Sequence, residues 1–124
     1  MRHRSLNHVA LYVEDVARSE SFYEDVLRLT RIERPAFDFP GVWYRLGEDQ
    51  ELHLISGQDQ DPQVRSGANH FAILVDDMEE AERVLKERGG NPSRRRTRPD
   101  GALQIYLRDP DGHTIEICSE PETA

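Results

Sequence analysis

Residues 7–15 read NHVALYVED, and residues 69–77 read NHFAILVDD, so one stretch of this chain occurs twice. The two copies share the Asn, the His, the Ala, a Val and the final Asp, and most of the other differences are conservative. Apolar side chains alternate along each copy with the two-residue period of a strand, and an acidic pair ends it. Because self-similarity at a fixed offset marks repeated structural units, the chain is predicted to contain one unit twice.

A helical pattern follows each copy, and short strand-like runs follow each helix. The helices are expected at about Ala17 to Leu29 and at Met78 to Arg88, where Gly89-Gly90 closes the second one. Turn residues separate the later strands, which are expected near residues 30–34, 42–46, 51–56, 92–98, 102–107 and 113–118. Each half therefore reads as β-α-β-β-β, with module one at about 5–57, a polar linker at about 58–67 and module two at about 68–119.

Four polar residues interrupt the apolar alternation at matching strand positions of the two modules. His8 and His70 open the first strands, while His53 and Glu116 stand between apolar residues of the last strands, on the face away from the helices. One such His is more often a hydrogen-bonded structural group than a ligand. An approximate two-fold axis would bring all four together, where imidazole and carboxylate suit Zn²⁺, Ni²⁺, Fe²⁺, Co²⁺ or Mn²⁺. A divalent transition metal site is therefore predicted.

Length and composition exclude several classes of protein. The 124 residues fit a single domain, and a net charge of -8 disfavours nucleic acid as a partner. No run of about 18 apolar residues occurs, and the N-terminal MRHRSLNH has no signal-peptide core, so neither a membrane span nor export is expected. The single Cys118 excludes an internal disulfide. A cytoplasmic location is predicted.

Other polar residues receive separate interpretations. The basic run Ser93–Arg98 either attracts an anionic substrate or solvates an edge strand. His3 and His113 lack the strand placement of the four candidate ligands and are expected at the surface. Cys118 is expected to be an inert thiol.

Four motifs give the chain a family resemblance. They are NHVAL at residues 7–11 with Phe22-Tyr23 behind it, ELHL at residues 51–54, NHFA at residues 69–72, and DPDGHTIE at residues 109–116. Together they resemble the vicinal oxygen chelate superfamily, which includes glyoxalase I, fosfomycin thiol transferases, methylmalonyl-CoA epimerase, extradiol dioxygenases and bleomycin-binding proteins. The resemblance implies an α+β fold in which two tandem βαβββ modules form a partly open, mixed, barrel-like sheet with helices outside.

The resemblance also implies metal ligands and a chemistry. His8, His70 and Glu116 match the ligand positions, and His53 occupies a fourth position that varies within the superfamily. The metal chelates two neighbouring substrate oxygens and stabilises an enediolate or related anion. Glu116 and His53 are candidate catalytic residues, because either one can exchange between ligand and proton carrier.

The expected activity is that of a glyoxalase-like lyase or isomerase acting on a small oxygenated metabolite or a thiol adduct. The alternatives are an Fe²⁺ extradiol-type dioxygenase, using His8, His70 and Glu116, and a non-catalytic protein that binds a drug or metabolite. Bacterial glyoxalases contact glutathione through an Arg and an Asn at the positions held here by Tyr12 and Gly57. The thiol and the substrate are therefore left open.

Alternation places further side chains near the candidate ligands. Tyr12 lies on the His8 side of its strand, and Trp43 or Arg45 is expected to line the floor or wall of a substrate site. Tyr12 either positions the substrate through its hydroxyl or fills the mouth of the barrel. A small-molecule substrate and a homodimer are the expected partners, with the site formed either within one chain or across two.

Overall fold

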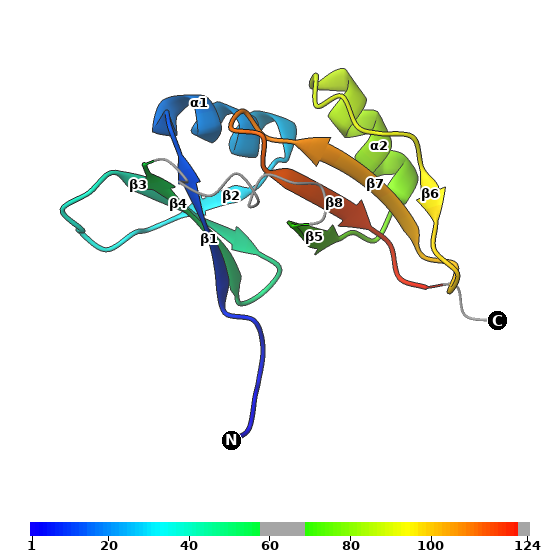
Figure 1. The fold of residues 1–124 in the computed structure, drawn as a ribbon, viewed down its shortest axis with the longest axis horizontal. Coiled ribbons are helices and arrows are strands. Elements are labelled where there is room, and N and C mark those ends of the chain that lie inside the picture. Colours follow the sequence, from blue (N-terminus) through cyan, green and yellow to red (C-terminus); the bar gives the residue numbers. More distant parts are fainter. Residues whose placement is uncertain (58–68, 122–124) are drawn as a thin grey trace. The chain divides into compact units, whose positions relative to one another are not determined.

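The computed structural model describes residues 1–57 and 69–121. The chain divides into two compact units, residues 1–60 and 61–124. Each unit carries one four-stranded sheet and one helical layer (Figure 1). The linker predicted at 58–67 lies outside the described residues.

Unit 1 follows the order β-α-β-β-β. Its sheet has the order β1-β4-β3-β2, with β1 parallel to β4 and the other neighbours antiparallel. The elements are β1 (His8–Val13), α1 (Val16–Ser21), the π-helical segment η1 (Phe22–Val26), β2 (Thr30–Ile32), β3 (Gly41–Leu46) and β4 (Gln50–Ser56).

Unit 2 repeats that plan. Its sheet has the order β5-β8-β7-β6, again with one parallel pair, β5 with β8. The elements are β5 (His70–Leu74), α2 (Met78–Glu87), β6 (Arg96–Thr97), β7 (Leu103–Arg108) and β8 (Thr114–Cys118). Two open, mixed four-stranded sheets with helices confirm the predicted α+β class.

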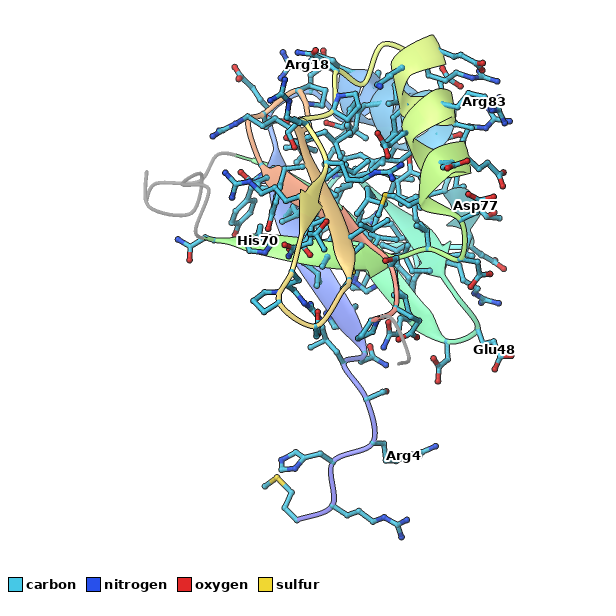
Figure 2. All side chains as sticks on the ribbon, turned by 90° about the vertical axis from the view of Figure 1, so that its right-hand side faces the viewer. Arg4, Arg18, Glu48, His70, Asp77 and Arg83 are labelled. Carbon is cyan, nitrogen blue, oxygen red and sulfur yellow. The ribbon has the colours of Figure 1, made fainter. Side chains whose placement is uncertain are left out.

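The second helix lies where the sequence predicts it, whereas the first changes from α-helix to π-helix part-way along. The Asp77 side chain caps α2 by accepting from the Glu80 backbone N–H at 3.1 Å, and Arg83 projects outward from the helix (Figure 2). In unit 1 the regular α-helix ends at Ser21, and a wider π-helical turn completes it. The single α-helix expected to Leu29 was wrong, because apolar spacing does not distinguish an α-helical turn from a π-helical one.

Apolar side chains from each sheet and its helix form a core within each unit. In unit 1 the fully buried residues include Leu52 and Leu54 of β4 and Tyr23 of η1. In unit 2 they include Ile105 of β7 and Ile115 of β8. The opposite face of each sheet is thereby left for the polar residues of the alternation.

None of the helices in the described residues has the length and apolar character needed to cross a membrane.

Candidate metal centre

The strand register places the candidate ligands at equivalent positions of the two units. In unit 1, His53 of β4 pairs with Ala10 of β1, two residues after His8. In unit 2, Glu116 of β8 pairs with Ala72 of β5, two residues after His70. Since Ala10 and Ala72 are matching residues of the repeat, His53 and Glu116 occupy the same place in their sheets.

In unit 1 the two candidate ligands are stacked imidazoles. The ring centroids of His8 and His53 lie 4.2 Å apart, with 18° between the ring planes. Nδ1 of His8 lies 2.8 Å from Asn7 Oδ1, and Nε2 of His53 lies 2.8 Å from Glu51 Oε1. Both of these partners accept, so a tautomer with its proton on that nitrogen would leave the lone pair of His8 Nε2 or of His53 Nδ1 for a metal.

Trp43 holds the buried His53 ring from the other side. Its indole stacks on His53 with a centroid separation of 3.8 Å and 1° between the planes. The cross-strand pairing of Trp43 with His53 in the β3–β4 register brings the two side chains together. His53 therefore lies between two rings, and it has few orientations available.

In unit 2 the pair is one imidazole and one carboxylate. His70 opens β5 (Figure 2). Its Nε2 lies 3.0 Å from Oε1 of Glu116 in β8. Nitrogen and oxygen donors bound about 2.1 Å from one metal at close to a right angle lie about 3 Å apart, so this spacing fits two ligands of a single ion. Glu116 is only 5% exposed, so its carboxylate depends on nearby partners for its hydrogen bonds.

Two residues of β7 supply those partners. The Tyr106 hydroxyl donates to Glu116 Oε1 at 3.1 Å, and Gln104 Nε2 donates to Oε2 at 3.0 Å. Burial, followed by the hydrogen bond to Glu116, raises the pKa of Tyr106 above its ordinary value. The hydroxyl therefore remains protonated at neutral pH and keeps donating.

The predicted substrate-contacting residues occupy different surroundings. Trp43 contacts His53 directly. Tyr12 is 46% exposed, and its ring packs over Gly57, where a Cβ would come within 2.8 Å of Tyr12 Cδ1. Arg45 is exposed and pairs with Glu51 in the β3–β4 register.

The structure also bears on the sequence predictions for His3, His113 and Cys118. His3 is exposed as expected, but His113 is only 3% exposed, so its assignment to the surface was wrong. The turn before β8 explains this burial, because Asp109 Oδ1 accepts from the His113 backbone N–H at 2.8 Å and folds the chain inward. Burial, followed by repulsion from Glu116, raises the pKa of the Cys118 thiol, in agreement with an inert cysteine.

The basic run Ser93–Arg98 is partly neutralised by acidic residues. Arg95 forms an ion pair with Glu82 of α2, and Arg98 forms one with Asp100. Arg96 lies in β6, the edge strand of its sheet. These contacts favour the interpretation of this run as a solvated edge.

Sequence reasoning missed Glu51, Gln104 and Tyr106. Alternation places Glu51 on the same face as His53, and Gln104 on the same face as Tyr106, but it does not say which residues are neighbours across the sheet. Over the described parts of both units, no group of three or more His, Cys, Asp or Glu side chains gathers around one point. Each unit by itself holds one pair of candidate donors.

Comparison with known proteins identifies the family. The model of the Glyoxalase/Bleomycin resistance protein/Dioxygenase superfamily matches residues 5–117. The chain belongs to this superfamily. Glyoxylase I 4 of Arabidopsis thaliana is 32% identical to it, over 93% of this chain and 70% of that protein. Metallothiol transferase FosB of Bacillus licheniformis is also 32% identical, over 90% of this chain and 73% of that protein. A glyoxalase family protein of Bacillus anthracis has the same superfamily fold, with a TM-score of 0.82 at 24% identity over 97% of this chain and 99% of that one.

Proposed function

We propose that this protein is a metal-dependent, glyoxalase-like lyase or isomerase acting on a small oxygenated metabolite or thiol adduct. His8, His53, His70 and Glu116 are the proposed ligands of one divalent ion, which is Zn²⁺, Ni²⁺, Fe²⁺, Co²⁺ or Mn²⁺. One observation carries the proposal: the two units hold a pair of nitrogen or oxygen donors at the same strand register. Membership of the superfamily and the glyoxalase and metallothiol transferase relatives support it.

A bound ion would act as a Lewis acid toward negative charge on two adjacent substrate oxygens. The protein's own residues would move the proton. Glu116 is the proposed base that carries a proton between neighbouring carbons, and Tyr106 and Gln104 hold its two oxygens in place. His53 is the second proposed proton carrier, and Trp43 and Glu51 fix its ring.

The substrate is proposed to lie against Tyr12, Trp43 and Arg45. All three belong to β1 and β3 of unit 1, and Trp43 is in direct contact with His53. Tyr12 offers a hydroxyl, and Arg45 offers a guanidinium that pairs with anionic oxygens. Replacing Arg45 with Met is expected to raise KM with little change in kcat, because it removes a binding contact from the ground state and the transition state equally.

A homodimer is part of the proposal. One ion then takes its two pairs of ligands either from one chain or from two. Mixing a His8→Ala chain with a Glu116→Ala chain distinguishes these arrangements. Ligands shared between chains restore one intact site in the mixed dimer, whereas ligands within a chain restore none. Metal content and turnover of the mixture are the readouts.

Metal analysis of the purified protein, followed by a reaction screen, tests the function. About one equivalent of a divalent transition metal per site is expected, and a chelator should abolish turnover that the same ion restores. Isomerisation of thiol hemithioacetals supports the proposal, and thiol transfer is screened because FosB is a metallothiol transferase. Oxygen uptake with catechols would instead select a dioxygenase. Failure to bind any of these ions would overturn the proposal.

A further inference from the structure

The segment between β2 and β3 carries a cluster of planar groups. The rings of Phe37 and Phe39 are stacked with centroids 5.2 Å apart. The guanidinium carbon of Arg34 lies 4.9 Å from the Phe37 centroid and 5.0 Å from the Phe39 centroid. Arg34 Nη2 also donates to the Phe39 carbonyl at 2.9 Å, which fixes the cation beside the rings. We call these three residues the aromatic shelf.

The shelf rings are exposed although they are strongly apolar. Phe37 is 47% exposed and Phe39 is 39% exposed. An aromatic side chain forgoes hydrophobic stabilisation over the part of its surface that stays in water. Neither ring is therefore explained by the packing of unit 1, and both keep surface available to a ligand.

The shelf continues without a break into the candidate metal ligands. Phe37 lies 6.1 Å from Trp43, Trp43 lies 3.8 Å from His53, and His53 lies 4.2 Å from His8, measured between ring centroids. A ligand resting on Phe37 and Phe39 thus lies along the same row of rings as two candidate metal ligands. Aromatic rings attract other planar rings in offset or edge-to-face geometry.

We infer that the aromatic shelf binds a planar aromatic group of the substrate. This inference rests on the proposed function, because the two adjacent oxygens of that substrate would be held by the metal beside His53. It narrows the substrate class from small oxygenated metabolites in general to those that carry an aromatic ring next to the chelating oxygens. Small aliphatic substrates leave Phe37 and Phe39 unused.

Binding of 4-nitrocatechol to the full-length protein tests the shelf. Trp43 is the only tryptophan of the chain and touches both the shelf and His53, so quenching of its fluorescence reports the bound probe. The test variant replaces Phe37 and Phe39 with Leu, which keeps apolar volume and removes the rings. The matched control replaces both with Tyr, which keeps the rings. Single Phe39→Leu protein serves as the second variant, and all are checked for native circular dichroism.

The expected result is a Kd for 4-nitrocatechol about 3- to 10-fold higher in the Leu variants and near the wild-type value in the Tyr control. Lactate, which has adjacent oxygens but no ring, should compete with the probe for metal-loaded protein with the same inhibition constant in every variant. Equal probe affinity in all variants, or no probe binding to wild type, overturns the inference. A changed oligomeric state in the Leu variants with unchanged probe affinity also overturns it and makes the shelf a contact between copies.

The two proposals fail in different ways. Ring-dependent binding of the probe to protein that takes up no metal would overturn the proposed function and retain the aromatic shelf. Metal-dependent turnover with no effect of the Leu substitutions on probe affinity would retain the function and overturn the shelf.

Discussion

The two units hold equivalent candidate ligands with different forces. In unit 1, His53 is fixed mainly by ring stacking between His8 and Trp43. In unit 2, Glu116 is fixed by hydrogen bonds from Tyr106 and Gln104. Duplicated folds therefore preserve where a ligand stands, while the neighbours that orient it depend on its chemistry: a flat ring stacks on other rings, and a buried carboxylate accepts from donors.

The largest effect is expected at the carboxylate of unit 2. Glu116→Gln keeps an oxygen that accepts from Gln104 but removes the negative charge and the base, so kcat should fall about 10²- to 10⁴-fold. The matched control is Glu120→Gln, an exposed neighbour that should retain wild-type kcat. Steady-state kinetics on the substrate found in the screen give the ratio. A loss below tenfold with metal still bound would remove Glu116 from the proton transfer.

The residues that orient each pair should come next. Tyr106→Phe removes a hydroxyl donor to Glu116, and Glu51→Gln removes the carboxylate beside His53. Loss of such a partner typically weakens metal affinity 10- to 100-fold. Competition with a chromophoric chelator measures both variants. Because His53 also has two stacked rings, Glu51→Gln is expected at the lower end of that range, and a larger loss than for Tyr106→Phe would contradict the comparison.

The free energy of unfolding of Trp43 variants tests how much the stacking in unit 1 contributes to stability. Trp43→Leu removes the ring stacked on His53 and part of the packing, so the free energy of unfolding should fall by about 1–3 kcal/mol. Trp43→Phe keeps a ring and should lose about half as much. Urea unfolding followed by circular dichroism measures both, since the variants lack the only tryptophan. Equal losses for Leu and Phe would assign the effect to volume and not to stacking.

The repeat in the sequence was enough to predict the α+β fold, because strand alternation and a turn pattern occur twice. It also indicated the equivalence of His53 and Glu116, which the register of β1–β4 and β5–β8 now gives directly. Alternation assigns a face but not a neighbour across the sheet. Tyr106 and Gln104 were therefore missed, although they stand on the same face of β7.

Local geometry set other limits on prediction. The burial of His113 follows from the hydrogen bond that the Asp109 side chain accepts in the turn, which no hydrophobic period encodes. The π-helical segment η1 differs from an α-helix in one residue per turn, which a five-residue window does not distinguish. The exposed rings of Phe37 and Phe39 lie in a loop, where neither strand nor helix periodicity applies.

The smallest effect concerns the helical layer of unit 1, where Arg31 pairs with Glu20 and Glu24 and the Tyr44 hydroxyl donates to Glu24 at 2.9 Å. The hydrogen bond from Arg31 lowers the pKa of Glu24 below its ordinary value of 4.5, against a smaller opposing effect of burial. A carboxyl with a depressed folded-state pKa stabilises the fold above its unfolded pKa and loses that contribution as pH falls through the folded value. Wild-type protein should thus be more stable than Glu24→Gln above about pH 5, and the two should converge as the pH falls through the lowered pKa of Glu24. Glu24 is one-third exposed, so the difference is expected within about 0.2–1 kcal/mol.

Urea unfolding at several pH values measures this difference in the free energy of unfolding, with exposed Glu48→Gln as the control that should follow wild type. A difference between Glu24→Gln and wild type that stays the same at every pH at which the protein is folded would assign the loss to packing of Tyr44, because ionisation of Glu24 could not be its cause.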